Sequence, residues 1–285
     1  MSIKLTNVTH TYMPKTPFEK VALKSISLEI QKGEFVAVIG HTGCGKSTLV
    51  QHFNGLLRPD SGEVYVDGVK MEKKNTLKLR EKIGLVFQYP EHQLFEETVY
   101  KDIAFGLKRL KLSPEEQEKM IFDAAEKVGL DRSLMDRSVY ELSGGQKRRV
   151  AIAGVLVMNP SYLVLDEPAA GLDPEGKNEM LRFAKRLNKE QGTTIVLISH
   201  CMEDVAETAG RVIVMDDGEI IMDGPPSYVF SKYETLTERG LDVPEITRLF
   251  IRLHRYNAEV NPNVFTVEEG VAEIERLKRK GVMVL

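Results

Sequence analysis

The sequence predicts an α/β protein with an inserted helical subdomain and a small helical extension at its C-terminal end. Short apolar runs without polar alternation recur between residues 34 and 200, which is typical of strands covered on both faces of a sheet. Helical patterns separate these runs, and helical patterns also fill the chain from about residue 231 onward. At 285 residues the chain is long enough for one large domain or two modest ones.

Four runs rich in Val, Ile and Leu are predicted to be buried strands. They are residues 34–40 (EFVAVIG), 82–88 (KIGLVFQ), 162–168 (YLVLDEP) and 193–200 (TTIVLISH). Residues 211–224 are predicted to form an antiparallel hairpin, because the dipeptide Asp217-Gly218 favours a tight turn.

Two stretches are predicted to be mainly helical. Within the first, about 89–160, Ser113 is suited to cap a helix and Pro114 to occupy its first position. This stretch lies between two core strands, so we expect a helical subdomain inserted into a sheet domain of residues 1–230. Residues 231–285 are predicted to form a separate helical extension.

Composition excludes several classes of protein. Apolar residues make up 42% and charged residues 28% of the chain, as in ordinary soluble domains. A net charge of -3 gives no general attraction to nucleic acid, and no apolar run approaches the roughly 18–20 residues that cross a bilayer. The first residues lack the apolar core of a signal peptide, and two cysteines make no disulfide framework. We therefore expect a reduced, cytoplasmic protein.

A glycine-rich loop, GHTGCGKSTL at 40–49, follows a predicted strand and opens a helix. Its glycines let backbone amides converge on phosphate oxygens, and the helix N-terminus adds partial positive charge. Lys46 is expected to bridge the β- and γ-phosphates, and Ser47 to offer its hydroxyl to Mg²⁺. Cys44 is expected to react with thiol reagents when the site is empty, since a helix N-terminus lowers a thiol pKa. The residues assigned to the nucleotide here are Gly40, Gly43, Gly45, Lys46, Ser47 and Thr48.

Two adjacent carboxylates end the run 162–168. Neighbouring strand residues point to opposite faces, so Asp166 and Glu167 can serve different tasks. Asp166 is predicted to hold Mg²⁺, directly or through water, and Glu167 to polarise an attacking water. An isolated Asp-Glu pair is more often a solvated strand end. His200 ends the next strand, where a lone histidine is more often a satisfied polar residue than a catalyst.

A second anion-binding turn occurs in ELSGGQKRR, residues 141–149. Ser143 and the amides of Gly144 and Gly145 precede a predicted helix, and this arrangement favours a bound anion. The same residues also make an ordinary capped helix start, and the two interpretations are compatible.

Taken in order, these motifs resemble those of the ABC-type ATPases over roughly residues 1–230. The resemblance implies a P-loop ABC ATPase core with a mixed sheet, and the cofactors ATP and Mg²⁺. It implies that Gln88 is a Mg²⁺ ligand that senses the transporter, that Asp173 ends the D-loop, AAGLD, and that His200 contacts the γ-phosphate. Tyr12 matches the aromatic residue that stacks on adenine; Phe18 is a weaker candidate, and either ring can be plain packing.

The same resemblance assigns a role to the second turn. It implies that the signature residues bind the γ-phosphate of an ATP held by another subunit, so that two chains enclose two ATPs head to tail. The monomer is then expected to bind ATP and barely hydrolyse it. The residues concerned are Ser143, Gly144, Gly145 and Gln146.

The segment FQYPEHQLFEETVYKDIAFG, residues 87–106, resembles the energy-coupling factor (ECF) ATPases. We expect its apolar members to line a groove for a helix of a membrane partner, although Ile103 has an equally good interpretation as packing inside the helical subdomain. Residues 231–285 resemble the extension through which these ATPases pair, and the Pro-containing insertion after Tyr12 resembles that of the second, A-prime, component. The groove residues are Leu94, Phe95, Val99, Ile103 and Phe105.

The resemblance therefore implies the ATP-hydrolysing subunit of an ECF importer at the cytoplasmic face of the cell membrane, powering uptake of a vitamin or a transition-metal ion. The implied partners are a sibling ECF ATPase or a second copy of this chain, a transmembrane coupling protein and a small substrate-binding membrane component, without nucleic acid. Two alternatives stay open: the ATPase of a binding-protein-dependent importer, and a soluble nucleotide-gated module.

Overall fold

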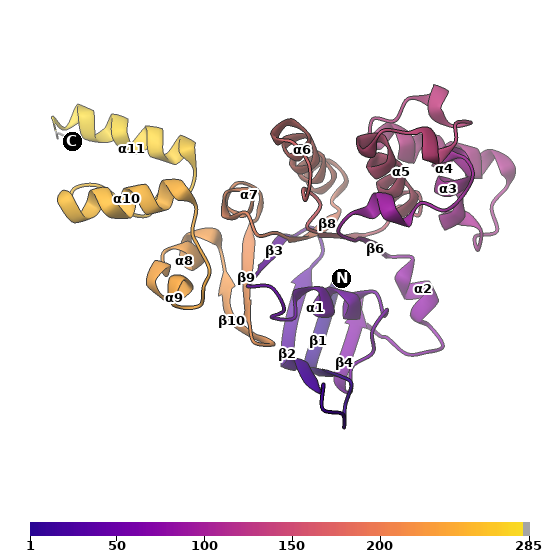
Figure 1. The fold of residues 1–285 in the computed structure, drawn as a ribbon, viewed down its shortest axis with the longest axis horizontal. Helices are drawn as coiled ribbons and strands as arrows, with labels where there is room; N and C mark the ends of the chain where they lie inside the picture. Colours follow the sequence, from indigo (N-terminus) through magenta and orange to yellow (C-terminus); the bar gives the residue numbers. More distant parts are fainter. Residues whose placement is uncertain (282–285) are drawn as a thin grey trace.

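The computed structural model describes residues 1–281 and contains two sheets, a helical lobe and a group of C-terminal helices (Figure 1). The smaller sheet is antiparallel, with the strand order β2-β1-β4-β5. Its strands are β1 (Ser2–Tyr12), β2 (Lys20–Gln31), β4 (Ser61–Val66) and β5 (Val69–Lys70).

The larger sheet has six strands in the order β10-β9-β3-β8-β7-β6. All neighbours are parallel except β10, which pairs antiparallel with β9, so the predicted mixed sheet and the predicted hairpin are both present. The strands are β3 (Phe35–Ile39), β6 (Ile83–Val86), β7 (Tyr162–Asp166), β8 (Thr194–Ile198), β9 (Arg211–Asp216) and β10 (Glu219–Gly224).

Both faces of the larger sheet are covered, which explains why its strands are apolar throughout. In β3, Phe35, Ala37 and Ile39 pack into one buried cluster with α6 and α7, while Val36 and Val38 pack into another with the antiparallel sheet and α1. The covering helices are α1 (Lys46–Phe53), α2 (Thr76–Arg80), α6 (Pro174–Gln191) and α7 (Met202–Thr208).

The helical lobe, which we define as α3, α4, α5 and the short 3-10 helices near them, buries an apolar cluster of its own. Ser113 and Glu116 form a capping box at the start of α4, with Pro114 in the first turn as the sequence predicts. The elements are α3 (Val99–Ala104), α4 (Pro114–Lys127), α5 (Gly144–Leu156) and the 3-10 helices Pro90–Gln93, Phe105–Leu107, Arg132–Leu134 and Val139–Glu141.

Packing onto the large sheet continues past residue 230. Phe230, Leu236 and Phe265 belong to the same buried cluster as β3, whereas α10 and α11 pack on each other around Phe250 and Leu277. The domain boundary near residue 230 therefore stays a prediction. The C-terminal helices are α8 (Pro226–Phe230), α9 (Tyr233–Glu238), α10 (Glu245–Tyr256) and α11 (Val267–Arg279).

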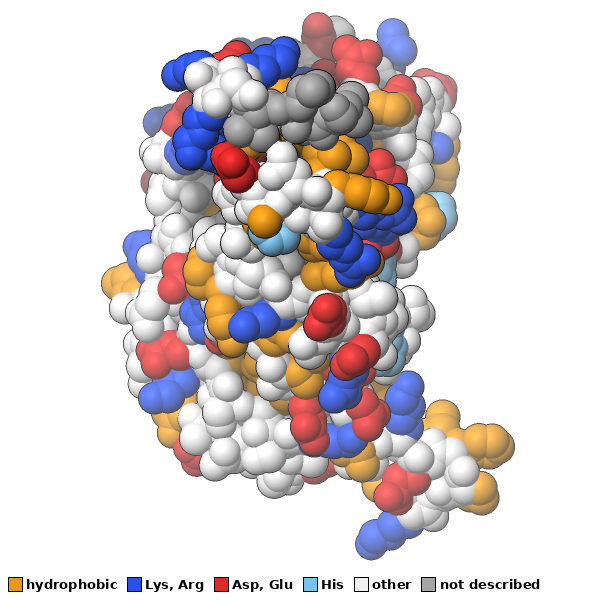
Figure 2. Space-filling view, turned by 90° about the vertical axis from the view of Figure 1, so that its left-hand side faces the viewer, with side chains coloured by type: hydrophobic (Ala, Val, Ile, Leu, Met, Phe, Trp, Pro, Cys, Tyr) orange, Lys and Arg blue, Asp and Glu red, His pale blue; other side chains and the backbone are white. Residues whose placement is uncertain are grey.

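The face that carries the C-terminal helices mixes apolar side chains with charged ones (Figure 2). Leu249, Tyr256 and Val271 are exposed apolar residues of α10 and α11. No helix among residues 1–281 is both long enough and apolar enough to cross a bilayer.

The first prediction concerns His52 in α1, whose side chain is fully buried. Its Nδ1 lies 2.8 Å from the carbonyl oxygen of Thr48, and its Nε2 has no hydrogen-bond partner among the described residues. Burial lowers the pKa of His52 below its ordinary 6.5, because the charged form is desolvated. The unfolded chain then binds the proton more readily, so stability present above pH 6.5 is lost as the pH falls below that value.

We expect the free energy of unfolding to fall through this group between pH 7.5 and 5.5, by at most about 1.4 kcal/mol, the limit for a histidine that stays neutral in the folded chain. Thermal melts at both pH values are the measurement. His52→Leu should show a smaller pH difference than the parent chain, while His92→Leu, which removes an exposed histidine, should leave it unchanged. Equal pH differences for His52→Leu and the parent chain would contradict the argument.

Candidate active site

A cavity of about 530 Å³ opens at the carboxyl ends of the parallel strands. The loop after β3, Gln88 after β6, Glu167 after β7 and His200 after β8 all reach this edge, because parallel strands end on the same side of a sheet. The cavity is lined by Tyr12, Lys20, Ala22, Thr42, Gly43, Gly45, Lys46, Ser47, Thr48, Gln88, Glu167 and His200.

The glycine-rich loop between β3 and α1 leaves no room for larger residues. Gly45 has a φ of 109°, and a Cβ there would lie 2.5 Å from the carbonyl oxygen of Ala22. A Cβ at Gly40 would lie 2.3 Å from the carbonyl oxygen of Met215. The loop therefore needs glycine at these positions to bring its backbone amides and the first turn of α1 to the cavity.

Lys46 is almost fully buried, 6% exposed, at the start of α1. Its ammonium donates hydrogen bonds to the carbonyl oxygens of Gly40, at 2.7 Å, and of His41, at 2.9 Å. Both partners are neutral, so the charge of Lys46 is not cancelled by a carboxylate and remains available to an anion in the loop.

Ser47 and Asp166 meet where α1 begins and β7 ends. Ser47 lies beside the Asp166 carboxylate, which is 8% exposed. Burial raises the pKa of Asp166 above its ordinary value, while the Ser47 side chain and the nearby Lys46 charge act in the opposite direction. Ser47 lines the cavity, whereas Asp166 does not.

Glu167 breaks the strand geometry that the sequence predicts for it. Its φ is 49°, in the left-handed region, so the alternation of side chains along β7 ends at Asp166. Its backbone amide still donates to the carbonyl oxygen of Ile198 at 3.0 Å. Such a conformation costs of order 1–3 kcal/mol and is typical of functional positions. As a result Glu167 lines the cavity, next to the carboxylate of Asp166.

The Glu167 carboxylate is held by two of the predicted site residues. Oε1 lies 2.7 Å from His200 Nε2, and Oε2 accepts a hydrogen bond of 2.8 Å from Gln88 Nε2. Three strand ends thus fix one carboxylate, and His200, which is paired with Glu167, also lines the cavity. The roles of these residues stay predictions.

The two aromatic candidates for stacking on adenine lie in different places. Tyr12 lines the cavity, and its hydroxyl lies 3.2 Å from Thr48 Oγ1. Phe18 is 77% exposed and does not line the cavity. Sequence reasoning missed Lys20, which also lines it and donates a 3.2 Å hydrogen bond to the carbonyl oxygen of Gly43. A lone lysine at the start of a strand carries no motif, so only the pairing of β2 brings it to the loop.

The signature turn lies away from this cavity, because none of residues 143–146 lines it. Ser143 and Gln146 form a capping box at the start of α5: Ser143 Oγ accepts from the Gln146 amide at 3.3 Å, and Gln146 Oε1 accepts from the Ser143 amide at 3.0 Å. A Cβ at Gly144 or Gly145 would meet nothing within 4 Å. Packing inside this chain therefore requires neither glycine.

Asp173 is likewise outside the cavity and caps α6, where its Oδ1 accepts a 2.8 Å hydrogen bond from the Gly176 amide. In the predicted partner groove, Phe95 and Phe105 are exposed and their rings meet edge to face at 4.7 Å. Val99 and Ile103 are fully buried in the helical lobe, so the expectation that they line the groove is wrong.

The expectation for Cys44 is also wrong. The thiol is 2% exposed, and burial raises its pKa despite the helix N-terminus and the nearby Lys46. Cys201 is partly exposed, with its Sγ 3.2 Å from Lys177 Nζ. Desolvation therefore outweighs the helix terminus at Cys44.

Comparisons with known proteins agree with the resemblance to ABC-type ATPases. The family model described as ABC transporter matches residues 23–170. The chain is 54% identical over 280 residues to the energy-coupling factor transporter ATP-binding protein EcfA2 of Clostridium tetani, covering 97% of each chain. It is 52% identical to the protein of the same name in Acetivibrio thermocellus, covering 98% of this chain and all of that one.

Two solved structures share the fold. The cbiO1 protein of Clostridium perfringens, described as part of the ABC transporter complex cbiONQ, superposes with a TM-score of 0.73 at 41% identity, over 87% of this chain and 97% of that one. The ATP-binding cassette MJ0796, solved as a post-hydrolysis dimer with ADP and Pi, gives a TM-score of 0.70 at 33% identity, over 79% and 98%.

The cysteine geometry predicts an order of alkylation. In the nucleotide-free chain, N-ethylmaleimide should modify Cys201 before Cys44, because reagent access requires exposure. Peptide mass spectrometry over a time course measures both sites, and denatured protein, in which both thiols are accessible, is the control. Faster labelling of Cys44 in the native chain would show that the loop opens more readily than its packing indicates.

Proposed function

This chain belongs to the ABC transporter family, among the energy-coupling factor ATP-binding proteins, and from this membership we propose that it powers an ECF importer. It is an ABC-type ATP hydrolase coupled to transport. In our proposal it works at the cytoplasmic face of the cell membrane with a transmembrane coupling protein and a small substrate-binding membrane component. The cargo is a vitamin or a transition-metal ion.

The observation that carries the proposal is the convergence of a glycine loop with Lys46 and a fixed Glu167 in one cavity. The loop amides and Lys46 suit the β- and γ-phosphates of ATP, and Tyr12 lies at the cavity wall where an adenine ring can stack. Ser47 and Asp166 supply the hard oxygen donors that Mg²⁺ prefers. Gln88 donates a hydrogen bond to Glu167, which is the neighbour of Asp166. Bound Mg²⁺ would neutralise phosphate charge.

Glu167 has the geometry of a group that positions water. Its two oxygens are fixed by His200 and Gln88, so the carboxylate is oriented before any substrate arrives. Each of these oxygens keeps a second lone pair, so the carboxylate can still accept a proton from water. For His200 to contact the γ-phosphate, as the family resemblance implies, it would have to leave Glu167. Gln88 links the same carboxylate to the segment that follows β6.

The position of the signature turn supports pairing of two ATPases. Ser143, Gly144 and Gly145 lie outside the cavity that contains Lys46, and a Cβ at either glycine would meet nothing within 4 Å. A backbone without side chains permits close approach of a phosphate held by another subunit. Each chain would then offer its signature turn to the ATP of its partner, with Asp173 beside the contact. The partner is a sibling ECF ATPase or a second copy of this chain.

The surface that we propose for the membrane partner is smaller than the groove that the sequence predicts. It consists of the exposed pair Phe95 and Phe105, with Lys108 Nζ 4.5 Å from the centre of the Phe105 ring. Two exposed aromatic rings on a rigid lobe suit an amphipathic helix laid across them. On the other end of the chain, the exposed apolar residues of α10 and α11 support the proposed role of the extension in pairing.

Glu167→Gln tests the hydrolytic assignment. The substitution keeps the size of the side chain and one hydrogen-bonding oxygen but removes the charge, so phosphate release should fall by about 10²–10⁴-fold. Gel filtration should show an ATP-bound dimer that persists. Glu175→Gln, in the exposed first turn of α6, is the matched control and should hydrolyse ATP normally. Unaltered turnover in Glu167→Gln would remove Glu167 from this role.

Isolation of the tagged chain from its native membranes in mild detergent tests the transport assignment. Mass spectrometry of the stoichiometric partners should identify a sibling ATPase, one large helical membrane protein and one small membrane protein. A conventional permease pair would instead make the chain the ATPase of a binding-protein-dependent importer. A wholly soluble complex would overturn the transport proposal.

A further inference from the structure

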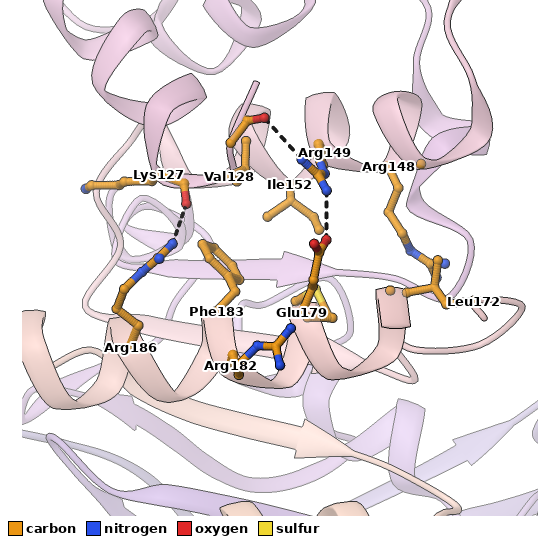
Figure 3. Close-up of a pocket in the computed structure, with 14 residues that line it drawn as sticks. Lys127, Val128, Arg148, Arg149, Ile152, Leu172, Glu179, Arg182, Phe183 and Arg186 are labelled. Atoms are coloured by element: carbon orange, nitrogen blue, oxygen red, sulfur yellow. Dashed lines mark hydrogen bonds and ion pairs between the residues drawn. The ribbon is translucent and has the colours of Figure 1, made fainter. Parts of the chain in front are cut away.

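A second cavity of about 420 Å³ lies between the helical lobe and α6 (Figure 3). Its walls come from the end of α4, from α5 and from α6, and it shares no lining residue with the cavity that holds Lys46. Its volume is within the range of about 300–1,000 Å³ typical of small-molecule sites. The aromatic groove at Phe95 and Phe105 contributes nothing to it.

The cavity is strongly basic, although the whole chain has a net charge of -3. Glu179 is the one acidic residue in its wall, and it is already paired with Arg149 at 2.8 Å. Arg182 and Arg186 have no carboxylate within ion-pair distance among residues 1–281. Arg186 donates only to the carbonyl oxygen of Lys127, at 3.0 Å. The basic residues of the wall are Lys127, Arg148, Arg149, Arg182 and Arg186.

Arg148, in contrast, is already paired with a carboxylate. It is 5% exposed, its Nη1 donates to the carbonyl oxygen of Ala170 at 3.0 Å, and its Nε lies 3.8 Å from the Glu91 carboxylate. Its Nε and Nη2 are buried atoms without a hydrogen-bond partner among the described residues. Figure 3 shows this side chain extending from α5 along the cavity toward Leu172. Arg148 therefore adds positive charge to the wall, whereas Arg182 is the arginine that is open to an anion.

The same cavity also has an apolar surface. Ile152, Met180 and Phe183 are buried, and they line it together with Val128. The Arg186 guanidinium lies 6.0 Å from the centre of the Phe183 ring, so a charged group and an aromatic face are adjacent. A purely inorganic anion would leave this apolar wall unused, whereas an organic anion with a flat or branched apolar body would cover it.

We propose that this cavity binds a small organic oxyanion, a phosphate or a carboxylate. Its anionic group is held by Arg182 and its apolar body packs against Phe183 and Ile152. The bound molecule would join α5, whose first turn is the signature, to α6, which Asp173 caps. Occupancy would therefore fix the helical lobe against the sheet domain. The binding itself is independent of the transport assignment and of ATP hydrolysis.

The test uses naphthalene-1,5-disulfonate, an aromatic dianion, as the probe. Isothermal titration is done on the full chain with ADP in saturating amount, so that the Lys46 cavity is filled. We expect one binding event per chain that ADP does not compete with. Arg182→Glu should weaken it at least about tenfold, because a charge in the wall is reversed. Lys189→Glu makes the same charge change on α6 outside the cavity and should alter it less than about twofold.

Arginine footprinting places the bound probe. Phenylglyoxal modification, mapped by peptide mass spectrometry, should slow at Arg182 and Arg186 when the probe is present and stay unchanged at the exposed Arg255. Absence of binding at millimolar probe, competition by ADP, equal effects of the two charge reversals, or protection elsewhere would each overturn the proposal. Calorimetric binding to the Glu167→Gln variant separates these outcomes from any failure of the ATPase assignment, because the proposed site needs no hydrolysis.

Discussion

The parallel pairing of β3, β8, β7 and β6 is the constraint on which the candidate site depends. Because these strands run in one direction, the residues that follow them meet at one edge, although they are far apart in the sequence. The sheet is held by apolar layers on both faces, and this rigid base allows Glu167 to adopt a left-handed backbone conformation. Its carboxylate is then fixed by groups from two neighbouring strand ends.

The two glycine-containing turns differ in how their glycines are packed. In the loop with Lys46, neighbouring backbone requires glycine at Gly40 and Gly45, whereas a Cβ at Gly144 or Gly145 would meet nothing within 4 Å. The same residue type thus serves two physical needs: tight packing within the chain at the first turn, and access from outside at the second. This asymmetry between the turns is the structural argument for a site completed by a partner.

The helical lobe connects these regions through α5. Its N-terminus carries the signature, one side buries Val99 and Ile103 in the core of the lobe, and Arg148 and Ile152 face the basic cavity above α6. The exposed ring pair Phe95 and Phe105, the signature turn and one wall of the basic cavity therefore belong to one lobe.

The sequence by itself determined the strands of the larger sheet, the mixed α/β class, the glycine loop and the place of Asp166, Glu167 and His200 at strand ends, because apolar runs and local backbone demands are encoded in neighbouring residues. Tertiary structure alone decided the contribution of Lys20, the burial of Cys44 and the burial of the Arg148 guanidinium. These features arise where segments distant in the chain pack together, and no local pattern encodes the desolvation, charge pairing or cavity that results.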